Sequence, residues 1–233
     1  MVLRAGNVRS VTVTGPGNPA DADRPPSGVR SDLLDGVTRI CLDRPPVNAF
    51  TVEMFGQLAA AVRRSYADPG PVLLTGANGR FSAGFDINEP DPAGSAPYAA
   101  SMECLAVIRE YPGPVVAAVE GAAAGIGLLI AMSADILVVS RSARLRMPEA
   151  RLGIDIDVAP LRRFLPAPWI RRLCLLGEVI TAADLRLDRG TGAFVCEPGE
   201  AEGHAWAVLE SLAGVDAAFL RRAKRQLIEQ LST

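Results

Sequence analysis

The sequence is poor in residues on which several functional classes depend. It has one lysine, Lys224, and one histidine, His204, and aromatic side chains make up only 5% of its 233 residues. Its 24 lysines and arginines face 26 aspartates and glutamates, so the formal net charge is -2. This balance lacks the positive excess of a nucleic-acid surface. Because 49% of the residues are apolar but few carry rings, alanine, valine, leucine and isoleucine must supply most of the core.

Several sequence signatures are also absent. The four cysteines lie far apart, without a CxxC pair or metal-binding spacing. No run of about 18 apolar residues predicts a membrane span, and the start, MVLRAGNVRSVTVTG, lacks the apolar stretch of a signal peptide. The motifs GK[ST], GxGxxG and GxSxG do not occur either, and His204 lies outside every motif. We therefore expect a cytoplasmic protein without metal, separate cofactor, nucleic acid or membrane as a partner.

The hydrophobic pattern indicates an α/β protein. Residues 14–29 are rich in proline, glycine and aspartate and predict a loop or extension. From residue 30, the pattern alternates between short apolar strands and amphipathic helices. Strands are expected over 37–42, 71–76 and 114–121, with two more at DILVVS and ARLRM, and helices over 51–66, 98–109 and 122–132. The predicted organisation is an extension over 1–29, a core over 30–196 and a helical segment over 197–233.

Within that last segment, apolar residues recur every four positions. They are Val215, Phe219, Ala223, Leu227 and Leu231. This spacing places them on one stripe of an amphipathic helix.

Two segments rich in glycine and alanine carry the functional signal. In FSAGFD (81–86), small residues permit a ligand to approach the backbone, and the N–H of Phe85 is then free to point into a cleft. In VEGAAAGIGLLIAM (119–132), small residues lead into a predicted helix, whose first N–H groups suit a negatively charged oxygen. Taken alone, the first segment more simply indicates a tight turn, and the second the small-residue start of a buried helix.

Together, in this order, the two segments resemble the paired glycine motifs of the crotonase (enoyl-CoA hydratase/isomerase) superfamily. The upstream LDRPPVNAF and the downstream ARLRMPEARLGI and LLGEVITAADL also resemble family segments, so the resemblance spans roughly residues 30–230. It implies a spiral of ββα units that forms two roughly perpendicular sheets with helices outside. It also implies an enzyme of acyl-CoA chemistry, as in fatty acid metabolism. Family members form trimers through a longer C-terminal segment, so the short helical C-terminus here leaves homo-oligomerisation open.

The resemblance also assigns site residues. The backbone N–H groups of Phe85 and Ile126 correspond to the oxyanion hole, which holds the thioester oxygen when it becomes an enolate. The residues that correspond to the CoA-binding positions are Val47, Ala49, Ala83, Asp86, Ile87 and Gly125. Arg44 is a further candidate for a CoA phosphate, because arginine suits bidentate phosphate contacts, although a surface role fits it equally well.

The carboxylates indicate which reaction is catalysed. Family hydratases use two glutamates, and one of the two positions is Leu129 here, whereas the other is Glu149. Loss of one proton-transfer group argues against efficient hydration. Asp157, eight residues after Glu149, resembles the second acid of family isomerases, while Asp155 points the opposite way only if the segment is extended.

The favoured interpretation is therefore an enoyl-CoA isomerase that uses Glu149 and Asp157. Three alternatives remain open at this point. They are a hydratase using Glu149, a CoA-thioester hydrolase or dehalogenase with Asp157 as nucleophile, and a non-catalytic acyl-CoA binder.

Overall fold

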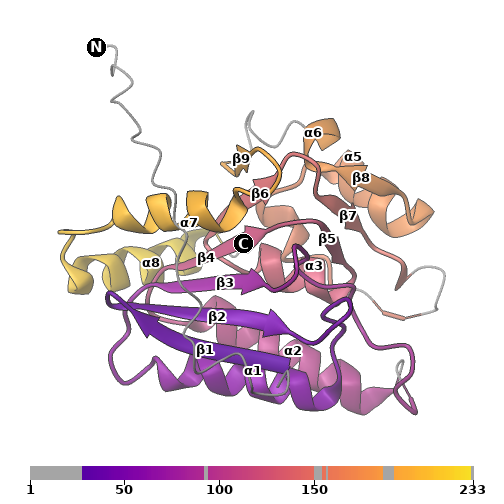
Figure 1. Cartoon of the computed structure of the whole chain (residues 1–233), viewed down its shortest axis with the longest axis horizontal. Coiled ribbons are helices and arrows are strands. Elements are labelled where there is room, and N and C mark those ends of the chain that lie inside the picture. The colour runs from indigo at the N-terminus through magenta and orange to yellow at the C-terminus, as the bar shows by residue number, and fades with distance from the viewer. Residues whose placement is uncertain (1–27, 92–93, 150–153, 156, 186–191, 232–233) are drawn as a thin grey trace.

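The computed structural model describes residues 28–91, 94–149, 154–155, 157–185 and 192–231. Most of the predicted N-terminal extension lies outside them. The larger of two sheets has six strands in the order β1, β2, β3, β4, β6, β9 (Figure 1). These are β1 (Gly28–Leu34), β2 (Val37–Asp43), β3 (Val72–Gly76), β4 (Val115–Val119), β6 (Ile136–Ser140) and β9 (Phe194–Cys196). Strand β1 pairs antiparallel with β2, and the other neighbours are parallel.

The smaller sheet consists of β5 (Ala122–Ala124), β7 (Arg144–Arg146) and β8 (Val179–Thr181). Isolated bridges between Ser82 and Ala123 and between Phe50 and Phe85 extend this pairing toward earlier parts of the chain. The chain thus alternates between a strand of the large sheet, a short stretch in the small one and a helix, as in β4, β5 and α3. The predicted α/β spiral with two sheets and surrounding helices is confirmed.

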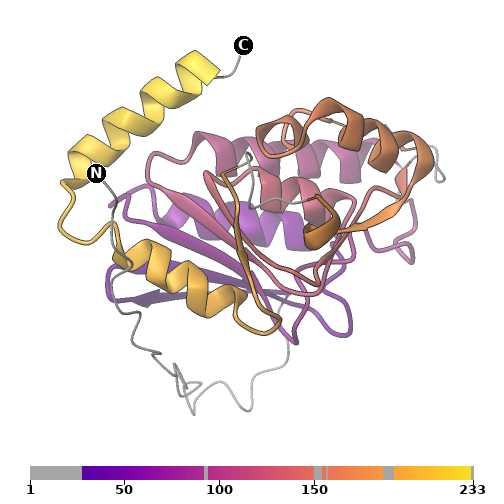
Figure 2. The ribbon, with the colours of Figure 1, turned by 90° about the horizontal axis from the view of Figure 1, so that it is seen from above.

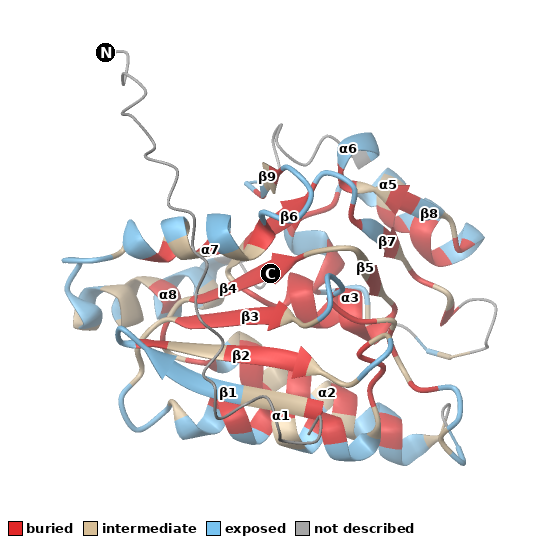
Figure 3. Cartoon of the chain, viewed as in Figure 1, coloured by how far each residue is buried: buried red, intermediate tan, exposed pale blue. Residues whose placement is uncertain are grey.

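Helices cover both faces of the large sheet. Helices α1 (Val52–Arg64), α2 (Ser95–Glu110) and α3 (Ile126–Met132) lie on one side, and α7 (Ala201–Glu210) lies on the other (Figure 2). Alternate residues of the central strands face these two layers, so β3, β4 and β6 are buried on both faces, whereas the edge strand β1 is largely exposed (Figure 3). Short helical segments follow β7. They are η2 (Leu161–Arg163), α5 (Ala167–Arg171), η3 (Arg172–Leu176) and α6 (Ala182–Leu185).

Two segments differ in type from the prediction, besides shifts of one to three residues at other boundaries. Strand β1 begins at Gly28, inside the stretch that was expected to be a loop. Residues 122–132 do not form one helix, because Ala122–Ala124 pair with β7 in a parallel register. Gly125 then adopts a φ of 51°, which ends the strand and directs the chain into α3. Pairing with a strand that comes later in the sequence overrides the helical tendency of three alanines.

The C-terminal helix α8 (Ala217–Leu231) projects beside the body of the molecule (Figure 2). Its predicted apolar stripe does not face this chain's core, since Phe219 and Leu227 are 52% and 55% exposed. One buried side chain anchors the helix instead. Lys224 pairs with Asp135 at 2.7 Å and donates a hydrogen bond to the carbonyl of Gly113 at 2.9 Å.

Replacement of Lys224 by methionine is therefore expected to destabilise the protein. It removes the closer of two cations from the partly buried Asp135 carboxylate, which keeps only Arg163 at 3.5 Å, at a cost of about 1–3 kcal/mol in the free energy of unfolding. Urea unfolding followed by circular dichroism measures this change. Arg225→Met on the exposed side of α8 is the control, and equal stability of the two variants would contradict the anchor.

No helix within the described ranges is long and apolar enough to span a bilayer.

Candidate active site

Asn48 joins the two loops that build one wall of the site. Its side-chain amide donates to the carbonyls of Ala77, Arg80 and Phe81 at 3.1, 2.9 and 3.3 Å. Its own carbonyl accepts from the hydroxyl of Ser82 at 2.7 Å. The residue is almost fully buried and has a φ of 52°, a conformation that asparagine tolerates better than most residues. It holds the segment 81–86 in a defined path.

The backbone N–H of Phe85 points away from Phe50, the residue with which Phe85 forms a β-bridge. Phe50 donates its N–H to the carbonyl of Gly84 at 2.7 Å and accepts from the N–H of Asp86 at 2.9 Å. In this parallel bridge, the N–H of the residue between them points to the other side. Among the described residues, the N–H of Phe85 has no acceptor. The path requires Gly84, whose φ is 95° and whose added Cβ would lie 2.8 Å from the carbonyl oxygen of Ala124.

The N–H of Ile126 is free for a different reason. Ile126 is the first residue of α3, and the first N–H groups of a helix have no partner within it. Two nearby backbone N–H groups already have acceptors. The N–H of Gly125 donates to the carbonyl of Arg146 at 2.8 Å, and the N–H of Leu128 donates to the carbonyl of Gly125 at 2.9 Å. Within the described part of the chain, Ile126 has no acceptor for its N–H.

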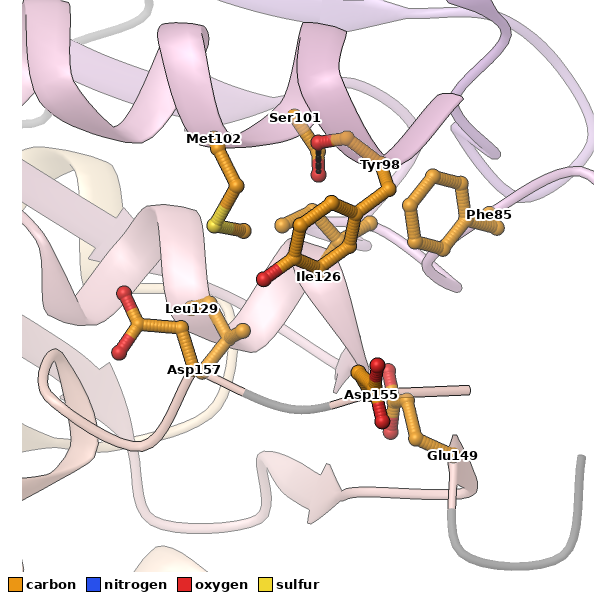
Figure 4. A pocket seen from close by; sticks show the side chains of 9 residues that line it. All are labelled: Phe85, Tyr98, Ser101, Met102, Ile126, Leu129, Glu149, Asp155 and Asp157. Atoms are coloured by element: carbon orange, nitrogen blue, oxygen red, sulfur yellow. Dashed lines mark hydrogen bonds between the residues drawn. The ribbon is translucent and has the colours of Figure 1, made fainter. Parts of the chain in front are cut away.

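Phe85 and Ile126 line the same pocket (Figure 4). The other residues that line it are Tyr98, Ser101, Met102, Leu129, Glu149, Asp155 and Asp157. Two uncommitted N–H groups at one pocket can stabilise an oxygen on which negative charge develops. The pocket also contains carboxylates, which can move protons.

Glu149 is the carboxylate most closely associated with these N–H groups. Its Oε1 packs against Gly125 so closely that a Cβ on this glycine would overlap it. The side chain is buried, and its Oε2 has no hydrogen-bond partner. Burial raises the pKa of Glu149 above its ordinary value of 4.5, and the nearby charge of Arg146 opposes the shift only in part. A carboxylate with these properties is a suitable general base.

Asp157 also lines the pocket but has two partners. Its Oδ2 lies 3.5 Å from Nη1 of Arg109 on α2, and its Oδ1 accepts the N–H of Ala159 at 2.9 Å. Asp155, which would point the opposite way in an extended segment, lines the pocket as well. Leu129 occupies the same pocket as Glu149, as predicted, and offers no proton.

The predicted CoA-binding residues lie around the two loops. The carbonyls of Val47 and Ala49 already accept from Ala83 and Arg44, and Ile87 is 73% exposed. Asp86 is buried, and the backbone N–H of Asn88 is the main cause that holds its pKa below the ordinary value.

Arg44, a candidate for a phosphate contact, is instead paired with the carboxylate of Asp86 at 2.6 Å. The side chain of Asp86 therefore serves this loop's internal structure. The sequence did not reveal the pair, because its members lie 42 positions apart.

Sequence reasoning missed the wall that α2 contributes. Tyr98, Ser101 and Met102 follow one another at i, i+3 and i+4, which places them on one face of the helix. This spacing was a usable signal, but it does not tell whether the face lines a pocket or the core.

Comparisons with known proteins show which proteins this chain is similar to. Residues 33–233 match the pattern of the enoyl-CoA hydratase/isomerase family. A 1,2-epoxyphenylacetyl-CoA isomerase from Escherichia coli is 34% identical over 66% of this chain and 64% of its own length. The (7aS)-7a-methyl-1,5-dioxo-2,3,5,6,7,7a-hexahydro-1H-indene-carboxyl-CoA hydrolase of Mycobacterium tuberculosis is 31% identical over 82% and 80% of the two chains.

A solved structure shares the fold of this chain. The enoyl-CoA hydratase/isomerase from Xanthobacter autotrophicus superposes with a TM-score of 0.80 at 26% identity, over 89% of this chain and 81% of that one.

Proposed function

This chain belongs to the enoyl-CoA hydratase/isomerase family, and we propose that it moves a double bond within the acyl group of an enoyl-CoA thioester. The N–H groups of Phe85 and Ile126 hold the thioester oxygen. Glu149 removes a proton from the carbon beside the carbonyl, and the electrons of the C–H bond move onto the oxygen as an enolate. The proton then returns to the chain two carbons farther on, by way of Glu149 or Asp157, and the double bond ends next to the carbonyl.

The observation that carries this proposal is the pair of unpartnered N–H groups beside a buried carboxylate. A proton next to a thioester carbonyl becomes removable only when the enolate oxygen is stabilised, and each such N–H contributes about 10²–10³ in rate. Burial makes Glu149 a stronger base than an exposed glutamate. Leu129 cannot transfer a proton, which favours a reaction that does not add water.

A second candidate is hydrolysis of a CoA-activated carbonyl compound. The relative from Mycobacterium tuberculosis, which aligns with most of this chain, is named as a CoA hydrolase. Two carboxylates besides Glu149, those of Asp155 and Asp157, line the pocket and could orient water. Hydratase activity that depends on Glu149 alone, an aspartyl intermediate on Asp157 and acyl-CoA binding without turnover are the remaining alternatives.

A substrate panel distinguishes these reactions. The purified protein is incubated with 2-enoyl-, 3-enoyl- and dienoyl-CoA thioesters, and the products are identified by liquid chromatography and mass spectrometry. We expect conversion of 3-enoyl-CoA to its 2-enoyl isomer without a change in mass. Hydration of 2-enoyl-CoA at about 10–10³ s⁻¹, the usual range for efficient enzymes, would overturn the isomerase assignment. A gain of one water with loss of a ring or a thioester would favour the hydrolase.

A further inference from the structure

Tyr98 presents a hydroxyl to the pocket that no part of the mechanism uses. It lies in the first turn of α2, where its N–H bonds to Gly94 at 3.3 Å and its carbonyl accepts from Ser101 at 2.7 Å. These bonds hold its backbone, while the ring crosses the pocket from the α2 side (Figure 4). Within the described ranges, its hydroxyl has no hydrogen-bond partner.

The other two tyrosines differ in this respect. The hydroxyl of Tyr66 donates to the carbonyl of Val107 at 3.2 Å, and that of Tyr111 donates to the carbonyl of Gly70 at 2.7 Å. Tyrosine hydroxyls that leave bulk water usually find such a partner. Tyr98 lines the pocket and is 40% exposed, so a ligand in the pocket can reach this side chain.

The hydroxyl lies beyond the predicted oxyanion hole rather than at it. It is directed toward the side of the pocket where Leu129 and Asp157 lie (Figure 4). Leu129 is one helical turn from Ile126, about 4.5 Å along the axis of α3. A ligand whose carbonyl oxygen contacts the N–H of Ile126 and whose acyl group runs toward Leu129 therefore passes Tyr98 beyond its carbonyl.

The neighbouring side chains do not supply another donor there. Leu129 and Met102 are apolar, and the carboxylates of Asp155 and Asp157 accept hydrogen bonds. The hydroxyl of Ser101 already donates to Tyr98's carbonyl. A hydrocarbon acyl group would cover the Tyr98 hydroxyl without pairing it, whereas an oxygen on that group would accept its hydrogen bond.

We propose that Tyr98 is a specificity-determining residue, and that the acyl group of the substrate carries a hydrogen-bond-accepting oxygen beyond the carbons that react. This inference rests on the proposed function, because it assumes that a CoA thioester occupies the pocket. It adds the chemical class of the acyl group, namely a chain or ring with a distal oxo, hydroxyl or ether oxygen.

Binding of two inert thioesters tests the inference without turnover. The dissociation constants of hexanoyl-CoA and 5-oxohexanoyl-CoA are measured by isothermal titration calorimetry for the wild type, Tyr98→Phe and Tyr66→Phe. A neutral hydrogen bond corresponds to a preference of about 3–10-fold. We expect the wild type and Tyr66→Phe to prefer 5-oxohexanoyl-CoA by this factor, and Tyr98→Phe to bind both thioesters equally.

The phenylalanine variant keeps the ring that fills the pocket, so misfolding is not expected, and circular dichroism verifies this. A preference that persists in Tyr98→Phe, or that is missing in the wild type, would overturn the inference while the proposed function stands. Failure of both thioesters to bind the wild type would refute the CoA-thioester site itself, and the inference with it.

Discussion

Glu149→Gln is expected to lower kcat for double-bond isomerisation by about 10²–10⁴, the usual contribution of a general base. The substitution keeps the shape of the side chain, so the KM for the thioester should change little. Because burial raises the pKa of Glu149 above 4.5, the acid limb of the wild-type profile of kcat/KM against pH should lie above that value. Steady-state kinetics over pH measure both effects, with the exposed Glu197→Gln as control. An unchanged kcat in the Glu149 variant would exclude this residue as the base.

The same substitution is expected to stabilise the fold at neutral pH. A carboxyl whose pKa is raised by folding contributes stability below its unfolded pKa, and this contribution is lost as the pH rises through the folded value. Above that pH, the wild type keeps a buried charge whose Oε2 has no partner. Neutral glutamine removes the charge, and we expect the free energy of unfolding at pH 7 to rise by about 1 kcal/mol. A loss of stability at pH 7 would contradict this interpretation of the burial of Glu149.

Asp157→Asn tests whether Asp157 moves the same proton as Glu149 or only holds its loop in place. If Glu149 and Asp157 move one proton, the double variant should be hardly slower than the slower single variant. If Asp157 only anchors its loop to Arg109, the single variant should keep most of its turnover.

Leu129→Glu is expected to increase hydration of 2-enoyl-CoA by about 10²-fold, because it restores the second proton-transfer group that family hydratases use. Leu129 already lines the pocket together with Glu149, so the new carboxylate would face the substrate. The cost is stability, since the position is only 3% exposed, and a loss of about 3 kcal/mol in the free energy of unfolding is expected. The rate of 3-hydroxyacyl-CoA formation measures the gain.

Leu129→Gln is the matched control for this experiment. Glutamine has nearly the same shape and can hold a water molecule, but it cannot donate or accept a proton in the reaction. An equal rise in both variants would mean that space or polarity, rather than proton transfer, limits hydration in the wild type. No rise in a correctly folded Leu129→Glu variant would refute the explanation that the missing acid suppresses hydration.

Local sequence pattern was sufficient for the central strands and the main helices, and the family resemblance supplied the architecture and most of the candidate site. The apolar strands at 72–76 and 115–119 and the helix at 52–64 arise from short-range periodicity, which is visible along the chain. Gly84 and Gly125 stand out in the sequence because only glycine fits the positive φ angles and close contacts that those turns need. The family resemblance then indicated Phe85, Ile126, Glu149 and Asp157, and all four line one pocket.

Only the tertiary structure determined how distant residues are paired. Arg44 contacts Asp86 instead of standing free for a phosphate, and Arg109 contacts Asp157 across 48 positions. The stripe on α8 has a helical period, but period does not tell whether a face meets this chain's core, and Phe219 remains exposed. Tyr98 lines the pocket because α2 packs beside α3, a contact between segments that no local pattern encodes. Sequence periodicity thus determined the main helices and central strands, whereas packing between distant elements determined short strands such as β5 and which side chains meet at the site.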